Sequence, residues 1–489
     1  MSRLVVVSNR VPSPRSKHSA GGLAVGVLSA LREKGGVWFG WSGDLVADPA
    51  ERRLDIVERG KLTYALVDLT EAEHAGHYAG MANRTLWPLF HYRIDLTSFE
   101  HEWYATYREV ARLFAERLLP LLRPDDRIWV HDFHLIPLGT ELRRLGWQGR
   151  LAFFLHIPFP PTQLYVTMPW HGELGADLTA YDAVGFQTPT DREHFVDYAV
   201  RELWAEVLDG QWIRAEGRPI EVHATPIGVD LKEMQRLSGS AEARRQYDTI
   251  RNHLADRALI VGVDRLDYSK GIPERLRGFQ ALLERYPQHR RNSVLMQISA
   301  PSREDLPEYR DLRRTTERLT GHIIGRFGEP DWMPLRYINR TQSRRTLAGF
   351  YRAARAGLVT PLRDGLNLVA EEFVAVQEPE DPGMLVLSRF AGAAFLLDGA
   401  LIVNPYDVYD VAAALDRALT MPLAERQERH ARQLAALQQN DIVAWRRHCL
   451  AALDGNPVPG EGQGAEAGPA GERTTAERYL DQAAGLAAA

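Results

Sequence analysis

Two cations, Arg265 and Lys270, flank an acidic, hydroxyl-bearing turn that follows a short apolar run. The run Leu259–Val263 is typical of a buried strand, so both cations would lie near the carboxyl end of that strand. Fixed cations in this position suit a diphosphate, whose negative charge grows as it departs from a substrate. A solvated surface loop has a similar composition, so the segment by itself leaves both interpretations open.

A second candidate anion site lies at Thr360–Glu372, which reads T-P-L-R-D-G-L-N-L-V-A-E-E. The pattern predicts a strand, a turn through Asp364 and Gly365, and a helix that begins near Asn367. Backbone N–H groups at a helix start bind anions, and Glu372, about one turn into the helix, could accept hydrogen bonds from ribose hydroxyls. The alternative is that Asp364 and Asn367 only cap a structural helix.

Histidines near two other predicted strand ends raise the question of a metal site. His131, Asp132 and His134 follow one apolar run, and His156 follows another. Histidine and carboxylate side chains can bind zinc or iron. Neighbouring side chains at a strand end point to opposite sides, so we do not expect these groups to converge on one ion. No D-x-D motif follows a predicted strand, so Arg265 and Lys270 would neutralise a leaving diphosphate without a metal.

Aromatic and cationic residues gather in the first half of the chain, at Arg10, Trp38, Trp41, Tyr78 and Trp87. Aromatic rings can cover the C–H faces of a sugar while arginine binds its phosphate. The alternative for any single tryptophan is a place in the core. A double glycine, at 21–22, could let backbone approach a sugar or phosphate, but it is not a G-x-G-x-x-G fingerprint.

The candidate residues follow apolar runs that alternate with helical patterns. Such alternation predicts an α/β fold with parallel sheets, in which ligands bind beyond the carboxyl ends of the strands. A chain of 489 residues is too long for one ordinary core. We therefore expect two α/β domains that face one another across a cleft, with a boundary near Thr225–Asp230. The predicted strands are Leu4–Ser8, Arg127–His131, Leu151–His156, Ala258–Val263, Val294–Ile298 and Ala356–Thr360.

Composition and charge narrow the class of protein. A net charge of −5 gives no indication of nucleic-acid binding. The single cysteine, Cys449, excludes an intramolecular disulfide and a zinc site of several thiolates. We see no signal peptide and no apolar stretch that would span a bilayer, so we expect a cytoplasmic protein with no membrane partner. The segment 455–489 is dense in Gly, Ala, Pro and Glu and is predicted to be disordered, with a short helix near Thr475–Ala484.

Taken in order, these segments resemble the trehalose-6-phosphate synthase family, a group of retaining glycosyltransferases of GT-B architecture. The resemblance runs from Ser2 to about Leu453. Its motifs are V-V-V-S-N-R ending at Arg10, G-G-L-A-V-G at Gly21–Gly26, W-F-G-W-S-G at Trp38–Gly43, L-W-P at Leu86–Pro88, V-H-D-F-H-L at Val130–Leu135, F-L-H-I-P-F-P at Phe154–Pro160, R-L-D-Y-S-K-G at Arg265–Gly271 and T-P-L-R-D-G-L-N-L-V-A at Thr360–Ala370.

The resemblance implies two Rossmann-like domains. Residues 1–230 would bind glucose 6-phosphate, with a helix at about 441–453 completing that domain, and residues 231–440 would bind the nucleotide sugar, UDP-glucose by family default. The donor residues would be Gly22, Arg265, Lys270, Asp364, Gly365, Asn367, Leu368, Val369 and Glu372. The acceptor residues would be Arg10, Trp41, Tyr78, Trp87, Asp132 and Arg303. The catalytic residues would be His156, Asp132, Arg265 and Lys270, with His156 near the reacting centre of the donor glucose.

The resemblance further implies metal-independent, front-face transfer, no cofactor, only small-molecule substrates and a homo-oligomer, either a dimer or a tetramer. Three residues depart from the family pattern. Phe133 stands where tyrosine is usual, Ile324 where asparagine is frequent, and Thr341 where a close bacterial pattern has histidine, which leaves the choice among UDP-, GDP- and ADP-glucose open. The rival hypotheses are a related enzyme with another acceptor, such as glycerol 3-phosphate, and a non-catalytic regulatory relative.

We predict that Arg265→Ala or Lys270→Ala abolishes turnover and leaves the fold intact, because either change removes a cation that would stabilise the leaving diphosphate. Turnover is measured on purified variants whose circular dichroism matches the unmodified chain. Near-normal turnover in either variant refutes the assignment of these cations.

Overall fold

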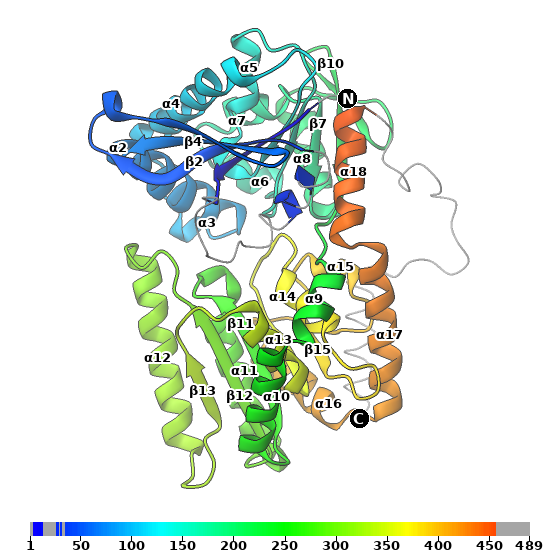
Figure 1. Cartoon of the computed structure of the whole chain (residues 1–489). Coiled ribbons are helices and arrows are strands. Elements are labelled where there is room, and N and C mark those ends of the chain that lie inside the picture. The colour runs from blue at the N-terminus through cyan, green and yellow to red at the C-terminus, as the bar shows by residue number, and fades with distance from the viewer. Residues whose placement is uncertain (1–2, 13–25, 29, 32–34, 456–489) are drawn as a thin grey trace. The chain divides into compact units, whose positions relative to one another are not determined.

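A computed structural model of the chain describes residues 3–12, 26–28, 30–31 and 35–455 (Figure 1). The predictions for Gly22 and for the tail beyond Gly455 lie outside the described residues. The chain forms two compact units, of which the first runs to Ile227 and resumes at Ala444, and the second spans Gly228–Val443. Within the described part of the chain, no helix has the length and apolar character needed to cross a membrane.

The first unit is built on a 10-stranded, mainly parallel sheet in the order β3-β4-β2-β1-β5-β6-β7-β10-β9-β8. Its central strands are continuous apolar runs, typical of parallel strands that are buried on both faces. The order of the parallel strands reverses between β1 and β5, which makes this a topological switch point. The strands are β1 (Leu4–Arg10), β2 (Gly36–Val46), β3 (Leu54–Arg59), β4 (Leu62–Thr70), β5 (Arg127–His131), β6 (Leu151–Phe154), β7 (Ala183–Phe186), β8 (Glu206–Val207), β9 (Trp212–Ala215) and β10 (Arg218–Ala224).

The helices of the first unit include the segment that returns after the second unit. In that helix, α18, the Trp445 indole lies 5.0 Å from Trp129 and 5.6 Å from Phe154, measured between ring centroids. Asp454 pairs with Arg127, so α18 is held at both ends to strands of this unit. The helices are α2 (Glu71–Glu73), the π-helix η2 (His74–Leu86), α3 (Trp87–Phe90), α4 (His101–Leu118), the 3₁₀ helix η5 (Phe133–Leu135), α5 (Leu138–Arg144), α6 (Thr162–Tyr165), α7 (His171–Leu178), α8 (Pro189–Glu202) and α18 (Ile442–Asp454).

The second unit has a 6-stranded sheet in the order β13-β12-β11-β14-β15-β16. All of its neighbouring strands are parallel. In chain order this is the doubly wound arrangement of dinucleotide-binding folds, and the order reverses between β11 and β14. The strands are β11 (Ala258–Arg265), β12 (Ser293–Ala300), β13 (Leu335–Ile338), β14 (Ala356–Val359), β15 (Met384–Ser388) and β16 (Leu401–Val403).

Helices of the second unit pack in two groups. One group is α12, α11 and α16, which contact one another in a row, and the other includes α10, α13, α9, α14 and α17 (Figure 1). The parallel α/β fold predicted from the alternating pattern is confirmed for both units. The helices are α9 (Leu231–Ser238), α10 (Ala241–Leu254), the 3₁₀ helix η6 (Tyr268–Lys270), α11 (Ile272–Arg285), α12 (Pro307–Phe327), α13 (Arg344–Ala353), α14 (Leu368–Ala375), α15 (Ala393–Leu396), α16 (Val408–Thr420) and α17 (Leu423–Gln439).

A buried arginine, Arg275 in α11, ties the carboxyl ends of three strands of the second unit together. It donates to Asp264 Oδ2 at 2.6 Å, to Gln297 Oε1 at 3.1 Å and to the Thr360 hydroxyl at 3.0 Å. Burial raises the pKa of Asp264, and the Arg275 guanidinium opposes that rise. The arginine therefore holds in register the strands whose ends carry the second unit's candidate residues. Nothing in its sequence context singled it out.

We expect Arg275→Met to lower the free energy of unfolding by about 3–5 kcal/mol, because it leaves the Asp264 carboxylate buried without its cation. A carboxyl with a raised folded-state pKa is penalised only when ionised, so the loss shrinks as the pH is lowered from neutral. Urea denaturation at several pH values measures both effects. Arg277→Met is the matched control, since that arginine is exposed on the same helix and pairs with Glu274. Equal losses in the two variants contradict the prediction.

Candidate functional site

The segment that carries Arg265 and Lys270 meets the segment Thr360–Glu372 at the switch point between β11 and β14. The backbone N–H of Leu362 donates to the Ser269 carbonyl at 2.7 Å. Gly271 has φ +60°, and a Cβ added there would lie 2.1 Å from the Thr360 carbonyl oxygen. Only glycine fits both the dihedral and the space, so this residue allows the loop after β11 to lie directly against the end of β14.

Lys270 and Asp364, 94 residues apart in the chain, form a largely buried ion pair. Their side chains are 12% and 13% exposed. Asn367 donates to the same Asp364 oxygen at 2.9 Å, and its own Oδ1 accepts from Ala370 N at 3.3 Å, at the start of α14. Asn367 is therefore a helix cap, as the alternative reading required, and it also holds Asp364 beside the lysine. The Gly365 turn is held in place because Asp364 N donates to the Phe390 carbonyl at 3.1 Å.

A buried carboxylate, Asp267, organises the other cations of this site. Its Oδ2 lies 3.3 Å from Arg303 Nη1, 3.9 Å from Arg265 Nη2 and 3.2 Å from the Tyr309 hydroxyl. The Arg265 side chain is 50% exposed and that of Arg303 is 10% exposed. Two guanidinium groups share one carboxylate, which leaves an excess of positive charge. The structure thus places Arg303 beside Arg265 in the second unit. The other predicted acceptor residues belong to the first unit.

Glu372, the predicted ribose ligand, lies one turn into α14. Arg344 Nη2 lies 3.2 Å from its Oε1. Burial raises the pKa of Glu372, and the Arg344 guanidinium opposes that rise. Leu368 and Val369 are the first two residues of the same helix, where backbone N–H groups have no partner within the helix. Arg344 was not identified from the sequence, because the pair spans 28 residues and no local pattern links them.

In the first unit, Arg10 at the end of β1 lies against Trp41 in the middle of β2. The guanidinium carbon lies 5.5 Å from the centroid of the indole ring. Gly43, in G-W-S-G, has φ +96°, and a Cβ added there would lie 2.7 Å from Arg10 Nη2. The glycine therefore leaves room for the arginine. Trp38, by contrast, is buried and donates to the Ser8 hydroxyl at 2.9 Å, so its core interpretation is the right one.

The remaining predicted acceptor rings are joined to Trp41 by ring contacts. Tyr78 lies in the π-helix η2, a rare conformation that is often found at functional sites and that the sequence pattern does not signal. Its ring stacks on His74 and on His134, with centroids 5.2 Å and 5.9 Å apart. The row of contacts runs from Trp41 through His74, Tyr78, His134 and Phe133 to Trp87.

Asp132, directly after β5, is strained. Its φ of 74° and ψ of 163° lie in a region that is essentially reserved for glycine. The carboxylate accepts from the His156 backbone N–H at 3.2 Å, and Asp132 N donates to the Phe154 carbonyl at 2.8 Å. Such strain costs about 1–3 kcal/mol and persists where the surroundings over-determine it, often at functional sites. Asp132 directly follows β5, the strand paired with β1, at the switch point of the first unit.

His131 and His156 form a buried pair, with Nδ1 and Nε2 3.0 Å apart. Burial lowers the pKa of His156 to about 3 and lowers the pKa of His131 as well. Both rings are therefore neutral at physiological pH. His134 stacks on Tyr78 instead, and among the described residues no group of three or more histidine, cysteine or acidic side chains is arranged to hold a metal ion.

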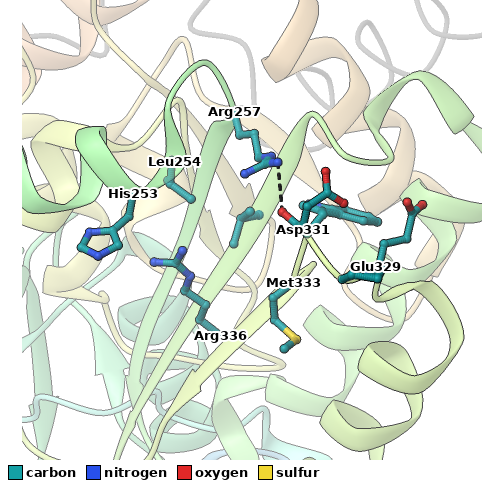
Figure 2. A pocket seen from close by; sticks show the side chains of 10 residues that line it. His253, Leu254, Arg257, Glu329, Asp331, Met333 and Arg336 are labelled. Atoms are coloured by element: carbon teal, nitrogen blue, oxygen red, sulfur yellow. Dashed lines mark hydrogen bonds between the residues drawn. The ribbon is translucent and has the colours of Figure 1, made fainter.

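A pocket of about 260 Å³ lies elsewhere in the second unit (Figure 2). Arg257, His253 and Arg336 line it, and Arg257 donates to the Asp331 carbonyl at 3.1 Å. Arg257 directly precedes β11 and Asp331 lies a few residues before β13, so the pocket lies at the amino ends of the strands. It is therefore distinct from the site at their carboxyl ends.

The model of glycosyltransferase family 20 matches residues 2–455. The chain belongs to this family. A trehalose-6-phosphate synthase of Sinorhizobium fredii is 47% identical over 453 residues, which cover 92% of this chain and 98% of the relative. A crystal structure of an alpha,alpha-trehalose-phosphate synthase (UDP-forming) from Burkholderia xenovorans in complex with glucose-6-phosphate is 47% identical, with a TM-score of 0.88 and coverage of 93% and 100% of the two chains.

A trehalose-6-phosphate structure from E. coli, bound with UDP-2-fluoro glucose, is 45% identical with a TM-score of 0.89 and covers 92% of this chain and 99% of that chain. The predicted family and enzyme class are therefore confirmed, and the chain is a glycosyltransferase of the GT-B fold. The roles of the individual site residues stay predictions.

We expect Asp132→Gly to be more stable than Asp132→Ala by about 1–2 kcal/mol, because both lose the carboxylate but only glycine tolerates this φ and ψ. Ordinarily glycine is the less stable of the two by about 0.5–1 kcal/mol. Urea denaturation measures the order. Ser8→Gly and Ser8→Ala, in the extended strand β1, are the control pair and should show the ordinary order. An alanine variant at Asp132 that is the more stable one contradicts the strain.

Proposed function

We propose that this chain transfers glucose from UDP-glucose to glucose 6-phosphate, forming α,α-trehalose 6-phosphate and UDP with retention of the anomeric configuration. The observation that carries the proposal is the presence of two separate sets of ligand-type residues, one at the switch point of each unit. The second unit presents Arg265, Arg303 and Lys270, and the first presents Arg10 beside Trp41. Near-full-length identity to trehalose-6-phosphate synthases supports it.

The charges of the second unit suit a nucleoside diphosphate. Arg265 and Arg303 lie beside Asp267, and Lys270 pairs with Asp364, so three cations gather around these two carboxylates. The start of α14 adds backbone N–H groups, and Glu372 would take the ribose hydroxyls. This arrangement stabilises a diphosphate most when its charge is largest, which is as it leaves the sugar.

The first unit suits a phosphorylated sugar. The Arg10 guanidinium beside Trp41 suits a phosphate, and the row of rings offers apolar surface to sugar C–H groups. Asp132 is proposed to accept a hydrogen bond from a sugar hydroxyl. The proposed acceptor role of Arg303 stays a prediction of the resemblance, since Arg303 belongs to the second unit.

We propose a front-face reaction. The acceptor hydroxyl oxygen bonds to the anomeric carbon on the side from which the diphosphate leaves, the bond from that carbon to the diphosphate oxygen breaks, and the hydroxyl proton passes to the departing phosphate. Arg265 and Lys270 neutralise the diphosphate, so the proposal requires no metal ion. A homo-oligomeric state and a cytoplasmic location stay predictions.

The test offers the purified protein UDP-, GDP- or ADP-glucose, each with glucose 6-phosphate or glycerol 3-phosphate, in the presence of EDTA. We expect release of UDP with glucose 6-phosphate only, measured as nucleoside diphosphate formed. Release with none of the donors, with or without added Mg²⁺, sinks the enzyme proposal. Release only with glycerol 3-phosphate favours the rival acceptor, and release that needs Mg²⁺ removes the metal-independent mechanism.

A matched pair of variants locates the acceptor site. We expect Arg10→Ala to raise the KM for glucose 6-phosphate at least about tenfold, the value of one charge-assisted contact, with little change in the KM for UDP-glucose. Arg336→Ala, in the pocket of Figure 2 away from the carboxyl ends of the strands, should change neither constant. An unchanged KM for glucose 6-phosphate in Arg10→Ala would show that Arg10 does not bind the acceptor phosphate.

A further inference from the structure

Gln187, the residue that follows β7 by one position, has both ends of its side-chain amide occupied. The backbone N–H of Ile227 donates to Gln187 Oε1 at 2.9 Å. A backbone N–H can only donate, so this contact identifies the amide oxygen. The amide nitrogen then lies 3.1 Å from His156 Nδ1 and must donate to it. Gln187 is 1% exposed, so both bonds are shielded from water.

The direction of this bond determines the protonation of two histidines. His156 Nδ1 accepts, so a neutral His156 carries its proton on Nε2. That Nε2 lies 3.0 Å from His131 Nδ1, which must therefore accept, and His131 carries its own proton on Nε2. The opposite direction would require a His156 ring with no proton at all. An imidazolium at His156 would set an Nδ1–H against the Gln187 N–H groups.

Burial and packing keep the pair in this state. Both histidine rings lie near the Trp445 indole, with centroids 6.0 Å and 6.3 Å away, and Trp129 lies 4.3 Å from His131. Burial lowers the pKa of His156 to about 3, which agrees with a neutral ring. Separately from its ring, His156 donates its backbone N–H to the Asp132 carboxylate, 3.2 Å away.

We propose that Gln187 is a positioning residue for the glycosyl transfer, holding the ring of His156 in place as the neutral Nε2–H tautomer. Its effect on turnover rests on the proposed function, whereas the tautomer does not. Both ring nitrogens of His156 are occupied inside the first unit. The ring of His156 therefore exchanges no proton with the substrate, and its contribution to the reaction is the placement of the ring itself.

The test uses ¹⁵N NMR of protein labelled at histidine, because imidazole nitrogens with and without a proton resonate far apart. In the unmodified chain we expect His156 Nδ1 to be unprotonated and Nε2 protonated throughout about pH 6–8, across the ordinary titration range of histidine. Gln187→Glu keeps an acceptor for Ile227 N–H but offers His156 only an acceptor. We expect this variant to move the His156 proton to Nδ1, or to protonate both nitrogens, and to lower kcat about tenfold with smaller changes in KM.

The control is Gln377→Met, compared with Gln187→Met. Gln377 is another buried glutamine whose Oε1 accepts from Gly383 N at 2.8 Å and whose amide nitrogen donates to the Tyr351 carbonyl at 2.8 Å, in the second unit. Both changes remove buried amide bonds, but only Gln187→Met should release the histidine tautomers.

A protonated His156 Nδ1 in the unmodified chain, or histidine signals unchanged in Gln187→Glu, overturns the proposal, and these two measurements decide it even if Gln187→Met does not fold. A normal kcat in Gln187→Glu with a moved proton removes the positioning role. If the unmodified chain shows the expected tautomers but releases no UDP, the function fails and the tautomer stands.

Discussion

The reversal of strand order at two places is the constraint from which the sites of this protein follow. Connections leave β1 and β5 in opposite directions, and so do those of β11 and β14. At each reversal the loops diverge and leave polar strand ends that no crossover covers. Arg10 and Asp132 lie at one such place, and Arg265 and Lys270 lie at the other. The strand order alone therefore leaves one position in each unit where a ligand can bind, whichever side chains lie there.

Buried carboxylates determine where the cations of the second unit's site lie. Asp264, Asp267 and Asp364 are all largely buried, and each is held by at least one cation. An unpaired buried carboxylate costs several kcal/mol, so these cations contribute to the stability of the fold. Arg265 differs from the other cations in its exposure, since half of its side chain is exposed while its Nη2 lies 3.9 Å from Asp267 Oδ2. Its guanidinium is therefore accessible to a ligand.

Strain and fixed protonation complete the arrangement. Three of the predicted site residues, Asp132, Arg303 and Asn367, have positive φ without being glycine. Each is held by side-chain hydrogen bonds to other parts of its own unit. Groups held in advance do not have to reorganise when charge develops in a transition state, which is the main source of electrostatic catalysis. In the His131–His156 pair, the protonation state is fixed in advance as well as the position of the rings.

The sequence by itself determined the family and the approximate position of six strands near the middle of the two sheets. The run Arg127–His131 was predicted with the bounds that β5 has, and β1 extends only two residues past its predicted end, because buried parallel strands are continuous apolar runs. Only the tertiary structure placed Arg303 beside Asp267, joined Arg344 to Glu372, buried Arg275 among three strand ends and set Gln187 against His156. The π-helix under Tyr78 was also missed. Apolar periodicity reports which face of a segment is buried, whereas these contacts join residues from separate elements, whose distance in space is set by strand order and packing.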